Sequence, residues 1–274
     1  MIVGTADGTT GIWNAETAAL EKVTEPHSVR VTALVAISDE LVVATHADGL
    51  ARLWHSRTAK SLLLIRHSSG FTAAAATLLG DAPAVLLAAE DHTVRLWDVK
   101  SRKWHWERRD HAMKVLSIAV CDDNDYAVTA ALDGTVRLWR VSDGASWGLN
   151  PAHQAEATTV AVGPGMLAVS GAQDGSAIVW DLRERTIRHH LDHGPAVDAV
   201  TAVAFTPSGQ YVVTGAADGG VRLWGIGAMA GRKLNQPRVR LMLDGPVTQM
   251  LISPAGDRAV IATVTGQLTC VELP

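Results

Sequence analysis

The sequence predicts an all-β fold built from seven copies of one unit of about 42 residues. The main observation is a short repeated segment, of which residues 133–139 (DGTVRLW) are the clearest copy. Its Asp-Gly pair favours a two-residue hairpin turn, which needs positive φ angles. The following residues alternate between the two faces of a strand and are rich in β-branched and aromatic types. The predicted building block is therefore a hairpin whose second strand ends in tryptophan.

The spacing of the copies predicts how the hairpins are arranged. Five more segments place an aspartate six residues before a tryptophan: 7–13, 48–54, 91–97, 174–180 and 218–224. A seventh, degenerate copy at residues 265–271 (TGQLTCV) has Val271 in the tryptophan position. A period of about 40–45 residues with four strands per unit is typical of β-propeller blades. We therefore predict a seven-bladed β-propeller with four-stranded antiparallel blades.

Each unit is expected to run from an inner strand a through strand b, a turn and strand c to an outer strand d. Strand b should be covered on both faces, because it is almost continuously apolar, as in residues 41–44 (LVVA). Since the repeat covers the chain from end to end, we predict a single domain, residues 1–274. Its units are approximately 1–26, 27–66, 67–110, 111–152, 153–192, 193–243 and 244–274.

The first and last blades are predicted to be incomplete. The first unit begins at strand b, residues 2–6, and the last ends at strand c. Strand a of the first blade and strand d of the last are therefore missing, either because the ring is incomplete or because the true start lies upstream of Met1. An incomplete ring would leave the edge at residues 267–272 unpaired, where a partner or a second copy could add a strand.

Composition narrows the class of partner and the compartment. The chain is 47% hydrophobic and 19% charged with a net charge of −4, which argues against a general nucleic-acid or anionic-membrane binder. The two cysteines, Cys121 and Cys270, cannot form a disulfide framework and fit a reducing compartment. No apolar run approaches the ~18 residues of a membrane span, and the first residues lack the regions of a signal peptide. A cytoplasmic location follows as the expectation.

The repeated segments and their spacing resemble the WD-repeat (tryptophan–aspartate repeat) family over essentially the whole chain. In that family a histidine before strand a, a serine or threonine on strand b, the turn aspartate and the tryptophan form a buried hydrogen-bonded tetrad. The resemblance implies complete tetrads in units four to six: His111, Thr129, Asp133 and Trp139; His153, Ser170, Asp174 and Trp180; His193, Thr214, Asp218 and Trp224.

Units two and three depart from the tetrad pattern, because Ala44 and Leu87 stand where the hydroxyl belongs. The remaining members are present as His27, Asp48 and Trp54, and as His67, Asp91 and Trp97. A missing hydroxyl should cost its blade about one hydrogen bond, roughly 0.5–1.5 kcal/mol. Units four to six are therefore expected to be the most rigid.

Three groups of residues invite a chemical interpretation. Ser170, His153 and Asp174 have the residue types of a hydrolytic triad, but the same types recur in other units, which favours a structural role. Residues 189–193 (HHLDH) suggest a metal site, yet the first and last histidines of a strand would lie about 13 Å apart. Residues 122–125 (DDND) suggest a calcium loop, but also an ordinary turn. No catalytic residue, metal or cofactor is predicted.

Residues 100–109 (KSRKWHWERR) are the main outlier from the repeat. Trp104 and Trp106 fall on the outer strand of the third blade, on one face by the strand period, among five Lys and Arg residues. Three interpretations stay open: packing on the edge of the blade, a protein contact, and base stacking with phosphate contacts.

The resemblance implies that partners bind where the d–a loops and b–c turns lie. The candidate contacts are Glu90, Lys114, Leu132, Glu156 and Gln173, each of which could equally be an ordinary loop residue. The predicted function is a non-catalytic scaffold that presents these loops to a protein or peptide partner. The alternatives are a propeller enzyme with a central-channel site and a nucleic-acid adaptor acting through residues 100–109. The sequence indicates neither the partner nor the oligomeric state.

Overall fold

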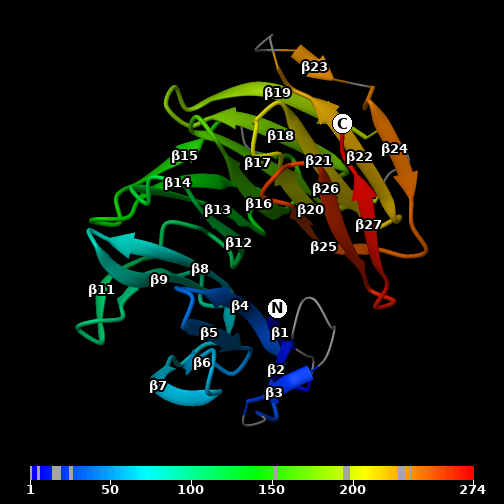
Figure 1. The fold of residues 1–274 in the computed structure, drawn as a ribbon. Helices are drawn as coiled ribbons and strands as arrows, with labels where there is room; N and C mark the ends of the chain where they lie inside the picture. Colours follow the sequence, from blue (N-terminus) through cyan, green and yellow to red (C-terminus); the bar gives the residue numbers. More distant parts are fainter. Residues whose placement is uncertain are drawn as a thin grey trace. The chain divides into compact units, whose positions relative to one another are not determined.

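The computed structural model describes residues 2–4, 7–13, 20–24, 27–150, 153–193, 198–227, 232–234 and 236–274 (Figure 1). Within these residues every helix or strand is a β-strand, and the strands form seven sheets, each built around consecutive hairpins. The predicted all-β fold of seven propeller blades is confirmed.

The strands follow the predicted order of four per unit, with two short sheets at the ends. The first three sheets contain β1 (Ile2–Gly4), β2 (Thr10–Trp13) and β3 (Leu20–Val23); β4 (Val31–Ala36), β5 (Leu41–His46), β6 (Leu50–His55) and β7 (Lys60–Arg66); and β8 (Phe71–Leu79), β9 (Ala82–Ala89), β10 (Val94–Asp98) and β11 (Lys103–Arg108). The fourth contains β12 (Val115–Val120), β13 (Tyr126–Ala131), β14 (Val136–Arg140) and β15 (Ser146–Leu149).

The last three sheets differ in strand number. The fifth contains β16 (Ala157–Gly163), β17 (Leu167–Ala172), β18 (Ser176–Asp181), β19 (Thr186–Asp192) and β23 (Arg232–Leu234). The sixth contains β20 (Val200–Phe205), β21 (Tyr211–Ala216), β22 (Gly220–Gly225) and β24 (Val239–Met242), and the seventh contains β25 (Val247–Ile252), β26 (Arg258–Thr263) and β27 (Leu268–Glu272). Three strands in the first and last sheets match the prediction. The additional β23, parallel to β19, was not predicted, because it belongs to the connection between β22 and β24 rather than to the repeat.

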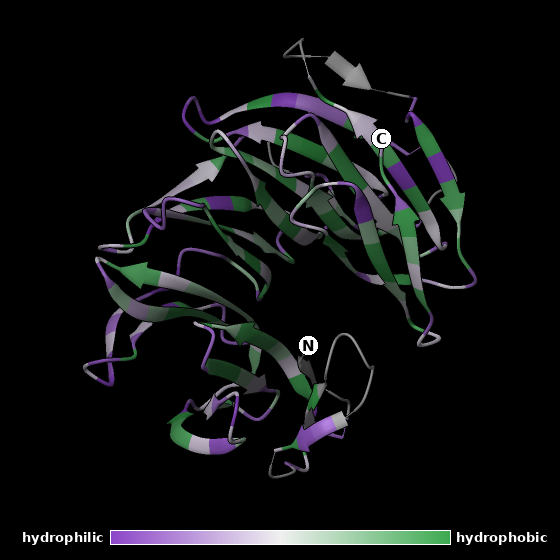
Figure 2. Ribbon diagram, viewed as in Figure 1, coloured by the Kyte–Doolittle hydropathy of each residue, from purple (hydrophilic) through white to green (hydrophobic). Residues whose placement is uncertain are grey.

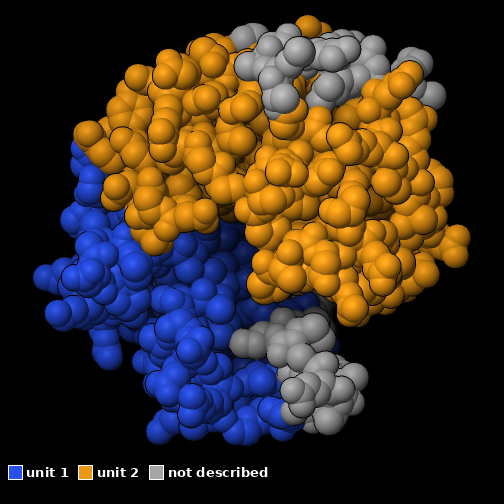
Figure 3. All heavy atoms as spheres, turned by 45° about the horizontal axis from the view of Figure 1, so that its top comes forward, with its two compact units in different colours: residues 1–117, 141–144 blue, residues 118–140, 145–274 orange. Residues whose placement is uncertain are grey.

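The chain divides into two compact units (Figure 3). Unit 1 contains residues 1–117 and 141–144, and in it β4 contacts both β1 and β8. Unit 2 contains residues 118–140 and 145–274, and in it β16 contacts β13 and β20, which in turn contacts β25. Within each unit, the inner strand of a sheet therefore lies beside the inner strand or strand b of the neighbouring sheet.

Strand b is deeply buried in the second to sixth sheets, as its apolar sequence predicts. Every residue of β17 is buried, and so are the last six residues of β9. Figure 2 shows these central strands as largely hydrophobic. Apolar side chains from neighbouring sheets form the core clusters, for example Ile178 and Trp180 with Val128 and Leu138 in unit 2.

The b–c turn is longer than the predicted two-residue hairpin. After β5, the backbone N–H of Gly49 donates to His46 O at 3.2 Å, so residues 47–49 form a three-residue loop. Gly49 has a φ of +81°, whereas no aspartate is among the described residues with positive φ. This is a turn followed by a left-handed glycine. The prediction of positive φ at both residues was wrong because it assumed the shorter hairpin.

Gly49 is also required by close packing. A Cβ atom at Gly49 would lie 2.3 Å from His67 O and 2.6 Å from Ser69 O, whereas one at Gly80, with a φ of +60°, would meet nothing within 4 Å. We expect Gly49→Ala to lower the free energy of unfolding by about 2 kcal/mol, because backbone strain and a steric clash act together. Gly80→Ala should lower it by about 1 kcal/mol, because only the backbone strain acts there. Urea unfolding of the two variants checks this, and equal losses would contradict the role of the loop carbonyls.

A threonine occupies the same irregular position in five a–b strand pairs. The register shifts at residues 31–33, 71–73, 157–159, 200–202 and 247–249, and the middle residue is Thr32, Thr72, Thr158, Thr201 or Thr248. Thr201 Oγ1 lies 2.5 Å from Val247 O on the next inner strand and 3.3 Å from Gly215 O of its own sheet. Thr158 Oγ1 makes the equivalent contact with Val200 O. These bulges therefore join the fifth, sixth and seventh sheets by side-chain hydrogen bonds.

Candidate functional site

The turn aspartates all make the same local hydrogen bond. In the six repeated segments, Oδ1 of the aspartate accepts from the backbone N–H two residues later, at 2.7–3.2 Å: Asp7 from Thr9, Asp48 from Leu50, Asp91 from Thr93, Asp133 from Thr135, Asp174 from Ser176 and Asp218 from Gly220. Such a bond closes an Asx turn. The aspartate is therefore held by its own hairpin before any partner is considered.

In the fifth sheet, serine, histidine and tryptophan meet in the core. Trp180 Nε1 donates to Ser170 Oγ at 2.9 Å, and Ser170 Oγ lies 2.6 Å from His153 Nε2. The other ring nitrogen of His153 lies 3.2 Å from Ser176 Oγ. Burial lowers the pKa of His153 to about 4, although Asp174 opposes this shift. The imidazole is therefore neutral at pH 7.

The sixth sheet has the same arrangement of tryptophan, hydroxyl group and histidine. Trp224 Nε1 donates to Thr214 Oγ1 at 2.9 Å, and this hydroxyl lies 2.8 Å from His193 Nε2. His193 reaches this place although it stands further upstream than in the other units. In the fourth sheet, Trp139 Nε1 donates to Thr129 Oγ1 at 2.7 Å. His111 of that unit is also buried.

The second and third sheets lack the hydroxyl, and the indole N–H has lost its acceptor. Among the described residues, Nε1 of Trp54 and of Trp97 is buried without a hydrogen-bond partner. The histidine–aspartate contact remains, at 2.7 Å between His27 Nε2 and Asp48 Oδ2. The corresponding distance from His67 Nε2 to Asp91 Oδ2 is 3.4 Å. The unpaired N–H groups are the physical result of Ala44 and Leu87 in the hydroxyl position.

Restoring the hydroxyl should stabilise the second sheet. We expect Ala44→Ser to raise the free energy of unfolding by about 1 kcal/mol, because Trp54 Nε1 gains an acceptor. The matched control is Ala88→Ser, also fully buried but one residue away from the equivalent position in the third sheet, which should destabilise. Urea unfolding of both variants measures the effect. A loss of stability in Ala44→Ser would contradict the assignment of this position.

An arginine two residues before the tryptophan was missed by the sequence reasoning. Arg222 Nη1 donates to His193 Nδ1 at 3.0 Å, and Nη2 lies 4.0 Å from Asp218 Oδ2. This arginine therefore bridges the histidine and the turn aspartate. The same position holds Arg52, Arg95 and Arg137, which contact His27, Asp91 and Ser146 respectively. The signal was visible in the repeated letters RLW, which occur in four of the segments.

The bonds of Ser170 argue against nucleophilic chemistry. Its side chain is completely buried, and its oxygen already accepts the indole N–H of Trp180. A nucleophile needs an open approach for a substrate and a base that is free to take its proton. The geometry of Ser170, His153 and Asp174 therefore fits a structural role.

The residues of the other two candidate chemical groups also have hydrogen-bond partners within the protein. Buried His189 places Nε2 3.1 Å from Ile226 O, while His193 belongs to the contacts above. Asp123 Oδ1 accepts from the N–H of Asp125 at 2.9 Å, and Asn124 has a φ of +58°, as in a turn between β12 and β13. In the described part of the chain, no group of three or more His, Cys, Asp or Glu side chains is placed to hold a metal ion.

Trp104 and Trp106 lie on opposite faces of β11, so their predicted placement on one face is wrong. The register shifts by one residue, so that Trp106 pairs with Leu96 but Trp104 pairs with Trp97. Neighbouring residues of β10 point to opposite faces, and their cross-strand partners follow them. The bulge therefore reverses the alternation that the strand period predicts.

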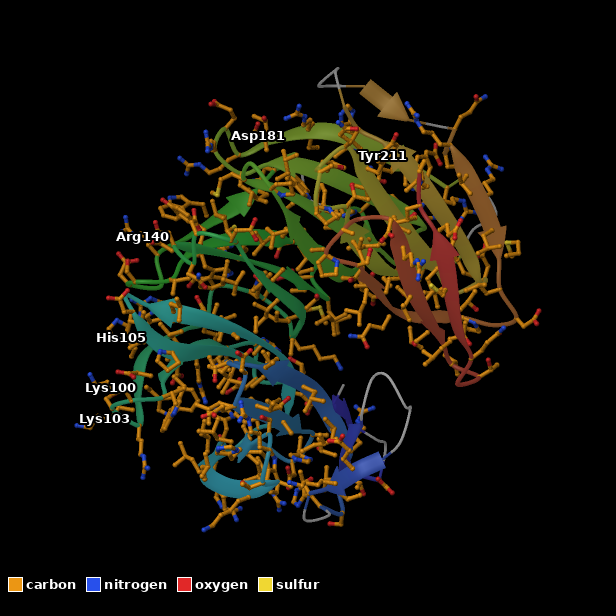
Figure 4. All side chains as sticks on the ribbon, viewed as in Figure 1. Lys100, Lys103, His105, Arg140, Asp181 and Tyr211 are labelled. Carbon is orange, nitrogen blue, oxygen red and sulfur yellow. The ribbon has the colours of Figure 1, made fainter. Side chains whose placement is uncertain are left out.

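Both rings take part in packing within unit 1. Trp104 packs edge-on against Trp97, with ring centroids 4.8 Å apart. Trp106 is 6% exposed, and its Nε1 donates to Val141 O at 2.7 Å. The exposed part of the hairpin carries Lys100 and Lys103, labelled in Figure 4, and His105, whose Nε2 lies 2.9 Å from Ser142 O. This geometry favours packing on the blade edge over base stacking.

The candidate loop contacts fall in both units. In unit 1, Glu90 is exposed and its N–H donates to Gly70 O at 2.8 Å, while Lys114 is half-buried. In unit 2, the N–H of Gln173 donates to Glu156 O at 2.9 Å, and both side chains are exposed. Leu132 is half-buried. The structure therefore brings Glu156 and Gln173 together, on a turn and a loop joined by a backbone hydrogen bond.

In the described residues we find no helix with the length and apolar character needed to cross a membrane. Cys121 is buried and Cys270 exposed, and both are free thiols. Burial raises the pKa of Cys121 to about 12, with Asp123 and Asp122 adding to the effect.

The chain is similar to one protein-family model and to several known proteins. Residues 105–140 and 184–225 match the family model described as WD domain, G-beta repeat. The chain is 27% identical over 232 residues to pre-mRNA-processing factor 19 homolog 2 of Arabidopsis thaliana, which covers 82% of the chain and 42% of the relative. It is 24% identical over 216 residues to the DENN domain and WD repeat-containing protein SCD1 of the same plant, covering 76% of the chain and 17% of the relative.

A third relative, small ribosomal subunit protein RACK1y of Oryza sativa subsp. japonica, is 27% identical over 161 residues, covering 55% of the chain and 46% of the relative. The chain thus spans less than half the length of each of these relatives. Two segments of the chain therefore match WD repeats, in agreement with its seven sheets and its six Asp-to-Trp hairpins.

Proposed function

We propose that this protein is a non-catalytic interaction scaffold that presents its b–c turns and d–a loops to a protein partner. WD-repeat proteins generally act in this way. The proposal rests on the observation that the serine and histidine side chains that could carry out chemistry are buried and hydrogen-bonded. Ser170, His153 and His193 are buried in hydrogen bonds to other residues of their own sheets.

The loop residues have the opposite character, which supports a role in contacts. Glu156 and Gln173 are exposed, but the backbone beneath them is fixed by a hydrogen bond between turn and loop. A rigid backbone avoids the entropic cost of ordering the loop when a partner binds, so that only the side chains have to be ordered. Glu90, bonded through its N–H to Gly70 O, repeats this arrangement in unit 1. Lys114 and Leu132 complete the proposed contact set.

The names of the relatives refer to pre-mRNA processing, to a ribosomal subunit and to a DENN-domain protein. They do not agree on one process, so no partner is carried over from them. The cytoplasmic location stays a prediction that the free thiols support.

The test compares partner capture by wild type and two loop variants, Glu156→Lys/Gln173→Ala and Glu90→Lys/Lys114→Ala. Captured proteins are identified by mass spectrometry, and the affinity of each is then measured with purified components. The matched control is Arg183→Ala/Glu184→Lys, two exposed residues on the c–d turn of the fifth sheet. We expect about tenfold weaker binding for at least one loop variant and no change for the control. Unchanged affinity in both loop variants would overturn the proposal.

A further inference from the structure

Two arginine side chains lie over the indole ring of Trp147, on the outer strand β15 of the fourth sheet. The guanidinium carbon of Arg140, the last residue of β14 and labelled in Figure 4, is 5.9 Å from the ring centroid. The guanidinium carbon of Arg185, on the c–d turn of the fifth sheet, is 5.4 Å from it. Both arginines are exposed, and all three residues belong to unit 2. The cluster therefore places two positive charges around one aromatic ring at the surface of this unit.

The indole N–H of Trp147 differs from the ring N–H groups at the same position in two other sheets. The outer-strand residues that pair with the position before the repeat tryptophan are Trp106, Trp147 and His189 in the third, fourth and fifth sheets. Trp106 Nε1 donates to Val141 O at 2.7 Å. His189 Nε2 lies 3.1 Å from Ile226 O. Within the described part of the chain, Trp147 Nε1 has no such partner, and it is not among the buried nitrogen atoms that lack one. This N–H is therefore able to donate to a ligand.

The cluster is held in place on both sides. Trp147 packs on the core cluster that contains residues of the fourth and fifth sheets. Asp181 Oδ1 accepts from the backbone N–H groups of Arg183 and Glu184, at 3.1 Å each. These bonds fix the turn that carries Arg185, whose φ of +56° is uncommon for a residue other than glycine. Because the ring and the turn are fixed before binding, little backbone ordering is required of the protein when a ligand binds.

The polar groups of this cluster are all donors, which favours an anionic ligand. A guanidinium group can bind a carboxylate through two parallel hydrogen bonds, and an indole N–H can only donate. Among the described residues, Arg185 forms no ion pair with an acidic side chain. Two guanidinium groups already lie over the ring, so a nucleic-acid base has less ring surface on which to stack. The charge of the cluster therefore complements an acidic peptide better than a nucleic acid.

We propose that Arg140, Trp147 and Arg185 bind an acidic segment of a partner protein. Carboxylates of the segment bind the two guanidinium groups, and one of them accepts from the indole N–H. Tryptophan and arginine are the residue types in which binding energy concentrates at protein interfaces. The site consists of an outer strand, the end of strand c and a c–d turn, whereas the proposed scaffold contacts are b–c turns and d–a loops. The two proposals therefore rest on different residues.

The probe is a fluorescent peptide of eight glutamate residues, and the matched probe is a peptide of eight glutamine residues. Binding to the full chain is followed by fluorescence anisotropy. The decisive variants are Arg185→Gln, which removes a guanidinium group, and Trp147→Leu, which removes the ring and its N–H. The matched control is Arg183→Gln, which removes the same charge from the same turn. The loop variant Glu156→Lys/Gln173→Ala should bind the probe as the wild type does, which separates this test from that of the scaffold.

We expect saturable binding of the glutamate peptide that each decisive variant weakens about tenfold and Arg183→Gln leaves unchanged. Because Arg185 is exposed, its variant should fold even if Trp147→Leu is unstable. Absent binding, equal weakening by Arg183→Gln, or equal affinity for the glutamine peptide would overturn the proposal.

Two further measurements test other occupants of the site. Oligothymidine that binds more tightly than the glutamate peptide, and through the same residues, would overturn the proposal in favour of nucleic acid. Light scattering is measured in parallel, and a dimer that Arg185→Gln dissociates would overturn it in favour of a second copy of the chain.

Discussion

Lowering the pH from 7 to 4 is expected to remove about 6 kcal/mol of stability through two histidines of unit 2. Burial lowers the pKa of both His153 and His193 to about 4 in the folded protein, from an ordinary value of 6.5. The unfolded chain therefore takes up protons first as the pH falls. This contribution is fully present above pH 6.5 and is lost as the pH falls through the folded value of about 4. Each histidine accounts for about 3 kcal/mol.

The local geometry explains why His193 and His153 resist protonation. Arg222 lowers the pKa of His193 further, because its guanidinium donates to Nδ1 and repels a second positive charge there. His153 has Ser176 Oγ in the equivalent place, so that charge repulsion from an arginine is absent and burial dominates. Protonation would break the contact of Arg222 with His193.

Urea unfolding at several pH values between 7 and 4 measures the expected loss. Carboxylates also titrate in this range, so the comparison is with His153→Gln/His193→Gln. The double variant should be less stable at pH 7 but lose about 6 kcal/mol less on acidification. Parallel stability curves for the two proteins would contradict the assignment.

Ser170→Ala is expected to cost about 3 kcal/mol of unfolding free energy. The serine oxygen contacts both Trp180 Nε1 and His153 Nε2, and all three residues are buried. Removing it leaves two polar groups unsatisfied, at about 1–3 kcal/mol each. The second and third sheets tolerate an unpaired indole, but there the histidine still contacts its aspartate.

The conservative variant Ser170→Thr separates the hydrogen bond from simple packing. Threonine fills this position in the fourth and sixth sheets as Thr129 and Thr214, where its hydroxyl accepts from the tryptophan. We expect Ser170→Thr to retain most of the stability. Thermal unfolding of the two variants distinguishes the cases, and a loss below about 1 kcal/mol in Ser170→Ala would show that the network contributes little.

The repeated hairpin was readable from the sequence because each copy fixes its own local geometry. The Asx bond of Asp48 and the buried strand β17 depend on residues close in the chain or on simple apolar patterning. The contacts of His153 with Ser170 followed from the family resemblance, which supplied partners 17 residues apart. Spacing and pattern were sufficient for these features.

Other features depend on register, which the strand period does not contain. The bulge that separates Trp104 from Trp106 adds one residue to β11 and reverses every face assignment beyond it. The bridge made by Arg222 requires the histidine and the aspartate to approach from different segments. The pairing of β23 with β19 arises from a connection that no other unit has. The sequence pattern could not show which loop residues contact a partner, because packing does not constrain exposed residues.

The threonine bulges have a consequence for how unit 2 responds to force. Thr158 and Thr201 join three successive inner strands across their sheet boundaries. Tension applied at the C-terminus must therefore shear a side-chain link before it can peel β25 away from β20. In single-molecule pulling, we expect the last three sheets to unfold in one event. In Thr201→Val, we expect the seventh sheet to unfold separately and at a lower force.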